Sequence, residues 1–173
     1  MKYLLITCIF VPAFLFAQHA EKTKKNNLGL YISANGSYNS KYNINNVLVD
    51  DDVENAQKAA QKTKENLAKV DMKELKEKEA HKRWMNIHKK LKTASDAIAN
   101  STELKEQRDH FDELSDNMTL GIQSFGINKK VYYQYCPMKN ENGAYWLSVE
   151  RKIKNPYFGE AMLKCGETIN TLD

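Results

Sequence analysis

Four sulfur-bearing side chains near the C-terminus could do chemistry together: Cys136, Met138, Met162 and Cys165. Thiolate and thioether sulfurs are soft ligands that suit Cu(I) or Ag(I). Cys136 and Met138 are two residues apart, so in a strand their side chains point to the same face. Met162 and Cys165 are three residues apart, so one helical turn places them on a shared face. If the two segments meet, four sulfurs converge on one metal site.

The same cysteines also fit a disulfide bond. A bond between Cys136 and Cys165 would close a loop of about 30 residues and stabilise the fold by roughly 3–4 kcal/mol. Met138 and Met162 would then fill gaps in the core, which is the commoner role of methionine. Spacing and cellular compartment alone favour this disulfide over the metal site.

The N-terminal residues indicate which compartment these cysteines occupy. Lys2 is followed by an apolar run over residues 4–17, which is the pattern of a secretory signal peptide and is too short for a confident membrane-spanning helix. We expect residues 1–17 to be cleaved, and the mature chain to be periplasmic or secreted with no membrane span. A lipid anchor on Cys8 is less favoured. Cleavage would remove Cys8 and leave an even pair of cysteines where disulfides persist.

Composition and motifs argue against several classes of protein. A chain of 173 residues predicts one domain. The 26 basic and 22 acidic residues are too balanced to indicate nucleic acid or an anionic membrane as partner, and we interpret the lysine-rich helix faces as solvated surface. The sequence contains no phosphate-binding loop or dinucleotide fingerprint. Neither Ser148 nor Cys136 has an activating partner by motif, so we expect no enzymatic activity.

Three apolar stripes predict the helices that position the sulfurs. Apolar residues recur at spacings of three and four over residues 49–70, 80–98 and 104–125. Asp71 is predicted to cap the second helix, and Gly126 to end the third. This pattern predicts a mainly α fold, a three-helix up-down-up bundle. We expect residues 18–45 to be a polar flexible leader and residues 46–173 to form the domain.

After Gly126 the pattern changes to that of a β-hairpin followed by a short helix. Residues 131–135 and 144–149 are β-branched and aromatic, and a turn at residues 140–143 separates them. Residues 160–164 predict one helical turn. This C-terminal hairpin and short helix carry the Cys-Pro-Met and Cys-Gly segments. Turn-forming roles are expected for Pro137, Gly143, Asn155, Pro156 and Gly159.

The C-terminal block resembles a bacterial envelope family, the domain-of-unknown-function family thirty-three forty-seven. The resemblance is carried by residues 135–138, 143–148, 155–159 and 162–166, and more loosely by Trp84, Gln107, Arg108 and Phe111. Members of that family occur as small exported proteins and as C-terminal extensions of membrane-fusion adaptors from heavy-metal efflux pumps. The resemblance implies a helical bundle that brings the Cys-Pro-Met and Cys-Gly segments together in a setting of copper or silver handling.

Together, the sulfurs and the resemblance predict a non-enzymatic periplasmic protein that binds or handles Cu(I) or Ag(I). Its expected partners are the metal ion and a heavy-metal efflux adaptor or another envelope protein, with no nucleic acid. The alternative is a disulfide-stapled module that binds another envelope protein without metal. The histidines are not expected to be ligands: His81 and His88 lie roughly 10 Å apart along a helix, and His110 is interpreted as exposed. His19 would lie two residues from the new N-terminus, a pattern that can bind Cu(II), but in a flexible tail this signal is weak.

Overall fold

The structure is a computed structural model, and it describes residues 43–70, 75–127 and 129–173. The predicted signal peptide, most of the predicted leader and Asp71 lie outside these ranges. The described helices are α2 (Ile44–Val49), α3 (Val53–Leu67), α4 (Lys78–Asn100), α5 (Leu104–Phe125) and the short 3₁₀ helix η3 (Gly159–Met162). The described strands are β1 (Val131–Cys136), β2 (Ala144–Ser148) and β3 (Glu167–Leu172). The predicted mainly helical fold with β-structure near the C-terminus is confirmed.

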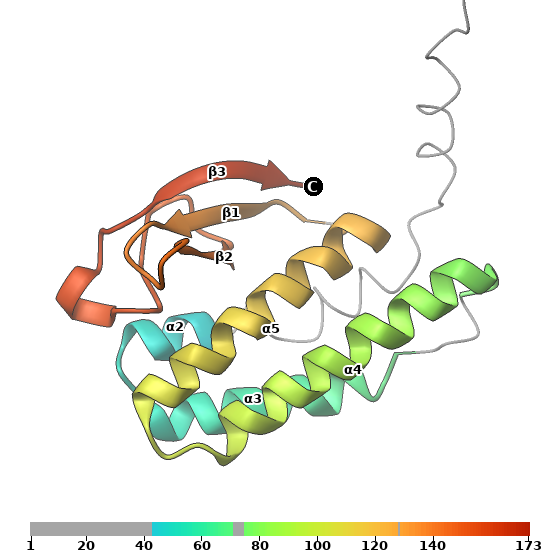
Figure 1. The fold of residues 1–173 in the computed structure, drawn as a ribbon, viewed down its shortest axis with the longest axis horizontal. Coiled ribbons are helices and arrows are strands. Elements are labelled where there is room, and N and C mark those ends of the chain that lie inside the picture. Colours follow the sequence, from blue (N-terminus) through green and yellow to red (C-terminus); the bar gives the residue numbers. More distant parts are fainter. Residues whose placement is uncertain (1–42, 71–74, 128) are drawn as a thin grey trace, which may run out of the picture.

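Helix α5 lies between the sheet and the other long helices (Figure 1). On one side α5 packs against α4, which in turn packs against α3. On the other side it contacts β2, an edge strand of the three-stranded sheet, whose order is β2-β1-β3. Helix α5 therefore supports the sheet on one side and the other long helices on the opposite side.

The predicted helix over residues 49–70 is wrong at its start, because the chain forms two helices there. Asp51 has a φ of +56° and interrupts the run between α2 and α3. The side chain of Asp52 caps α3, since its Oδ1 accepts a hydrogen bond from the Asn55 amide at 3.0 Å. Aspartate is favoured at such caps and tolerates left-handed backbone. Residues 43–45, which the sequence assigned to the leader, are buried and lie at the start of α2.

Helix α4 begins later than the sequence predicted. Residues 75–77 are not helical, and α4 starts at Lys78 with Glu77 as its N-cap. The predicted cap, Asp71, lies outside the described residues. Leu75 is only 5% exposed, and it reaches the core from this non-helical segment. From Trp84 to Ile98 the predicted stripe of α4 is buried, and the α5 stripe from Phe111 to Phe125 faces it. Burial of apolar side chains at three-four spacing is what holds the helices together.

The sheet contains one strand more than the sequence predicted. Strand β1 pairs antiparallel with β2, with Cys136 opposite Ala144. It also pairs antiparallel with β3, with Tyr135 opposite Glu167. Strand β3 was missed because its side chains are mostly exposed, so the strand lacks the apolar alternation that signals burial. Pairing with β3 is what carries the segment before Glu167 next to the end of β1.

None of the helices in the described ranges combines the length and the apolar composition needed to cross a bilayer.

Trp84 should be essential to the helical core. Its side chain is fully buried, and its ring meets Phe125 edge to face with centroids 5.8 Å apart. We expect Trp84→Ala to lower the free energy of unfolding by about 3–5 kcal/mol, because it leaves a large cavity. Urea denaturation followed by circular dichroism measures this. Met85→Ala is the matched control, since Met85 is 49% exposed; equal losses for both variants would contradict the packing described here.

Candidate functional site

The structure brings the two predicted cysteines together. Cys136 is the last residue of β1 and is fully buried, whereas Cys165 precedes β3 and is partly exposed. Their Sγ atoms are 3.8 Å apart, and both are free thiols. A disulfide would need a separation of about 2.05 Å. The pair thus lies close enough to share a ligand or to form a bond after a small rotation.

A buried asparagine, Asn155, joins the two cysteine segments. Its Nδ2 donates to the Sγ of Cys136 at 3.1 Å and to the backbone carbonyl of Cys165 at 2.9 Å. Its Oδ1 accepts from the Tyr157 amide at 2.9 Å. The Asn155 backbone amide donates to the Leu163 carbonyl, and its carbonyl accepts from Gly159, both at 3.0 Å. This residue was predicted only to shape a turn, and its contacts with Tyr157 and Gly159 fit that role. Its contacts with Cys136 and Cys165 are non-local and left no signal in the sequence.

Close packing behind Cys165 requires glycine at the next position. Gly166 has a φ of +140°, and a Cβ there would lie 2.6 Å from the Tyr135 carbonyl oxygen and 2.8 Å from the Trp146 ring. Trp146 is fully buried, as expected for strand core, and its ring packs edge to face on Tyr157 with centroids 6.1 Å apart. A bulkier residue at Gly166 would push Cys165 away from Cys136.

The two methionines lie at the surface. Met138 follows β1 and is 57% exposed, and Met162 ends η3 and is 38% exposed. The Cys165 amide donates to the Met162 carbonyl at 2.9 Å, so these two residues share one tight turn. Both thioethers are therefore more accessible to solvent than the Cys136 thiol, and neither methionine is a core gap-filler.

The turn after Cys136 is fixed to α5 by polar contacts. Lys139 forms an ion pair with Asp109, and the Lys139 side chain is only 12% exposed. Asn140 Nδ2 donates to Asp112 Oδ2 at 2.9 Å. Burial raises the pKa of the Asp112 carboxyl, although Lys139 acts in the opposite direction. Helix α5 thus holds the segment that carries Met138.

The ionisation of Cys165 is disfavoured in the folded chain. Burial raises the pKa of the Cys165 thiol, and the neighbouring Cys136 raises it further. Both the hydrogen bond and the repulsion between two thiolates favour the protonated form. A metal ion that binds here must therefore displace protons, and its affinity should fall as the pH falls.

The histidines do not gather around a metal site. His81 is exposed, and the Nε2 of His88 lies 3.3 Å from the Leu67 carbonyl oxygen. His110 is partly exposed, and His19 lies outside the described residues. Within the part of the chain that the structure describes, no three residues among His, Cys, Asp and Glu are placed to hold one ion. A metal bound by the two cysteines would need thioether or solvent ligands.

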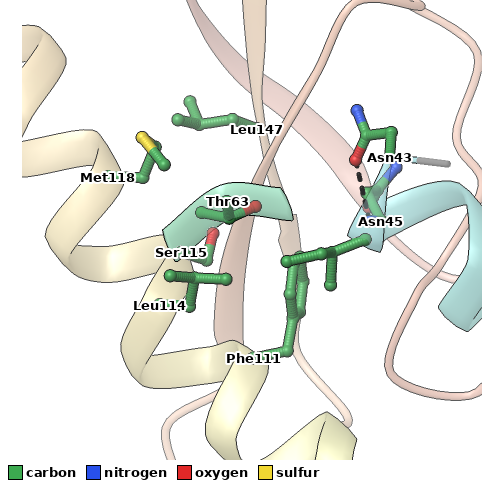
Figure 2. A pocket seen from close by; sticks show the side chains of 9 residues that line it. Asn43, Asn45, Thr63, Phe111, Leu114, Ser115, Met118 and Leu147 are labelled. Atoms are coloured by element: carbon green, nitrogen blue, oxygen red, sulfur yellow. Dashed lines mark hydrogen bonds between the residues drawn. The ribbon is translucent and has the colours of Figure 1, made fainter. Parts of the chain in front are cut away.

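A small cavity lies between α2, α3, α5 and β2. Its volume is about 30 Å³, enough for roughly one water molecule. Figure 2 shows Met118, Leu114 and Phe111 along one side and Leu147 across from them, with the hydrogen bond between Asn43 and Asn45 at the far edge. The cavity is too small for an organic substrate, and the cysteines do not line it.

A comparison with protein families gives one match. The model for the family described as "Protein of unknown function (DUF3347)" matches residues 38–130, which is 93 of the 173 residues. The chain belongs to this family. The family expected from the sequence is thus confirmed. Comparisons with curated proteins and with solved structures found no match.

The DUF3347 match lies on a different part of the chain from the main sequence resemblance. It covers helices α2 to α5 and ends before β1, so Cys136 and Cys165 both lie beyond it. The resemblance drawn from the sequence had its closest part at residues 135–166. Membership in the family rests on the helical part, and it assigns no activity to the cysteine pair.

Asn155 is the residue of this site that we expect to be most sensitive to substitution. Asn155→Ala would leave the Cys165 carbonyl and the Cys136 Sγ atom without their amide donor, and the Tyr157 amide without its acceptor. We expect a loss of about 2–4 kcal/mol in the free energy of unfolding, measured by urea denaturation. Asn86→Ala, at an exposed position of α4, should change stability by less than about 0.5 kcal/mol. A similar result for both variants would show that the Asn155 contacts contribute little.

Asp112 predicts a pH dependence of stability. The pKa of the Asp112 carboxyl in the folded chain is raised above the usual 3.8. Ionisation of this carboxyl therefore lowers the free energy of unfolding at neutral pH and has no effect below pH 3.8. Asp112→Asn should therefore raise the midpoint of thermal unfolding at pH 7, and the gain should vanish as the pH falls towards 3.8. Glu113→Gln, at the exposed neighbouring position, is the control. A destabilised Asp112→Asn variant at pH 7 would mean that the contacts with Lys139 and Asn140 outweigh the cost of burial.

Proposed function

We propose that this protein binds a soft monovalent metal ion, Cu(I) or Ag(I), and handles it without catalysing a reaction. The observation that carries the proposal is the 3.8 Å separation of the Cys136 and Cys165 Sγ atoms. These thiols come from positions 29 residues apart. Soft thiolates select soft ions, and adding thioethers to the set favours Cu(I) over Zn²⁺.

The distance between the thiols supports a bent coordination. Two thiolates bound at about 2.3 Å to one tetrahedral ion lie roughly 3.8 Å apart. The side chains of Cys136 and Cys165 are already at this separation. A linear arrangement would need them roughly 4.6 Å apart at the same bond length. The ion would therefore have room for further ligands beside the two sulfurs.

Met138 and Met162 are the proposed further ligands. Both side chains are partly exposed, and methionine has three rotatable bonds with which to reach a neighbouring ion. Met162 shares a tight turn with Cys165, which keeps the backbones of these two residues close together. An ion would reach the site from solvent at the partly exposed Cys165, and Cys136 would be its buried ligand.

The amide of Asn155 supports thiolate chemistry at Cys136. It donates to the Sγ atom at 3.1 Å, and a hydrogen bond to a charged acceptor is stronger than one to a neutral acceptor. When a metal ion displaces the thiol proton, this contact becomes more favourable. Asn155 thus acts as a positioning residue that orients the sulfur ligand, as groups next to metal ligands commonly do.

The proposed setting is the bacterial envelope. It rests on the predicted signal peptide at residues 1–17 and on the family resemblance stated from the sequence. In that setting the protein would hold Cu(I) or Ag(I) and pass it to another envelope component, for which a heavy-metal efflux adaptor is our candidate. The handover would be an exchange of ligands, with no change in the oxidation state of the ion.

Competition titration of the fully reduced protein with Cu(I) against a coloured chelator tests the proposal. We expect one ion to bind per chain, and Cys136→Ser or Cys165→Ser to abolish competition. The double change of Met138 and Met162 to Leu should weaken binding by at least about tenfold, the smallest effect typical of a group around a metal. Binding should also weaken at lower pH, because the pKa of Cys165 is raised.

Met85→Leu is the matched control, because Met85 is an exposed methionine on α4. This variant should bind Cu(I) like the unchanged protein. Unaltered affinity in the variant lacking Met138 and Met162 would refute the four-sulfur site and leave a two-cysteine site. The absence of any competition by the reduced protein would refute metal binding. Tighter binding of Zn²⁺ than of Cu(I) would refute the choice of ion.

A second candidate function is a disulfide-stapled module that binds another envelope protein. The same 3.8 Å separation favours it, because rotation of the two side chains could bring the sulfurs to bonding distance. The bond would join the end of β1 to the segment that leads into β3. Intact mass of protein taken directly from cells discriminates the two: a mass two hydrogens below that of the dithiol supports the staple, and free thiols support the metal site.

A further inference from the structure

Helix α4 carries a straight row of cations on the side opposite to its buried stripe. Lys78, Lys82, Lys89 and Lys92 are exposed, and Met85 lies in the middle of the row. Their spacings of three and four residues place all five on one side of the helix. The row is about 21 Å long at 1.5 Å per residue. We refer to these five residues as the α4 stripe.

The charge of the chain is concentrated on this helix. Helix α4 contains six basic residues and two acidic residues, a net charge of +4, which equals the formal net charge of all 173 residues. The rest of the chain is therefore neutral as a whole. The balanced composition that argued against an anionic partner conceals a local excess of positive charge. The basic residues of α4 are Lys78, Lys82, Arg83, Lys89, Lys90 and Lys92.

The neighbouring elements do not neutralise the α4 stripe. Among the described residues, none of its lysines takes part in an ion pair. Asp96, at the end of the same row, is paired with Lys64 of α3. The acidic residues of α3 pair with lysines of their own helix, Glu54 with Lys58 and Glu65 with Lys62. The row therefore presents its charge to solvent.

We propose that the α4 stripe docks on anionic lipid headgroups at a membrane surface. Each lysine near such a surface strengthens binding by about fivefold, so four in a row give substantial attraction. Met85 is 49% exposed at the centre of the row and offers an apolar group that the lipid interface accepts. In this orientation α4 lies flat on the lipid, while the sheet lies on the far side of α5 (Figure 1).

Charge alone would also suit a nucleic acid, but the chemistry of α4 does not favour a single-stranded one. Binding of single strands relies on exposed aromatic rings for stacking. Trp84 is the only phenylalanine, tyrosine or tryptophan in α4, and it is fully buried. The lipid proposal does not depend on metal binding, because the α4 stripe contains none of the four proposed sulfur ligands.

Co-sedimentation of the full chain with vesicles tests the proposal. The protein should bind vesicles of phosphatidylglycerol mixed with phosphatidylcholine, not vesicles of phosphatidylcholine alone, and added salt should release it. Changing Lys82, Lys89 and Lys92 to Gln should weaken binding on the order of a hundredfold. The matched control changes three exposed lysines outside α4, Lys130, Lys152 and Lys164, to Gln. It loses the same charge and should retain most of the binding.

A fluorescent variant gives a second readout that does not depend on removing charge. Met85→Trp would place an indole in the centre of the α4 stripe, and its emission should shift to shorter wavelength when anionic vesicles are added. No shift, or no binding to phosphatidylglycerol vesicles, would overturn the proposal. Equal losses in the two triple variants would do the same, since binding would then follow net charge. Tighter binding of duplex DNA than of anionic vesicles would assign the surface to nucleic acid instead.

Discussion

The arrangement of the C-terminal block depends on the buried amide of Asn155. A polar side chain that is fully buried must satisfy its hydrogen-bonding groups inside the protein, or it costs more than it contributes. Asn155 meets this requirement through Cys136 and Cys165, which belong to two other segments, and through Tyr157 in its own turn. Its backbone also closes the loop that contains η3. Moving any one of these segments would leave a buried donor or acceptor unpaired.

The two thiols are close because of this constraint together with the pairing of β1 and β3. Strand pairing brings Glu167 opposite Tyr135, and Gly166 allows the backbone to pass close to that strand. Cys165 then lies beside Cys136, and the hydrogen bonds of the Asn155 amide hold the two residues in this relative position. The burial that creates this contact also raises the pKa of Cys165. The protonated form of the Cys165 thiol is therefore favoured, and a metal ion that binds here must displace that proton.

The distribution of charge illustrates how little a net value says about a surface. Helix α5 uses its carboxylates to hold the turn after Cys136, through Asp109 with Lys139 and Asp112 with Asn140. Helix α4 has no such internal use for its outer lysines. The carboxylates of α5 thus hold the C-terminal block in place, whereas the outer lysines of α4 face the solvent. This difference is why we assign the two helices different roles.

The sequence by itself determined the long helices and two of the strands. Burial on one side of a helix or strand is a local, periodic property, so the stripes of α4 and α5 and the β-branched and aromatic runs of β1 and β2 could be read directly. It also pointed to the family and to Cys136 and Cys165 as a pair. The break between α2 and α3 was missed because the apolar spacing continues across Asp51, whereas the backbone turns there.

Only the tertiary structure decided the contacts between distant segments. Strand β3 is exposed on most of its length and gains its conformation from pairing with β1, which no local pattern records. The role of Asn155 depends on partners 10 and 19 residues away. The exposure of Met138 depends on how the turn after β1 lies on α5. Local periodicity fixes which residues form an element, but hydrogen bonds and packing between elements fix which sulfurs meet.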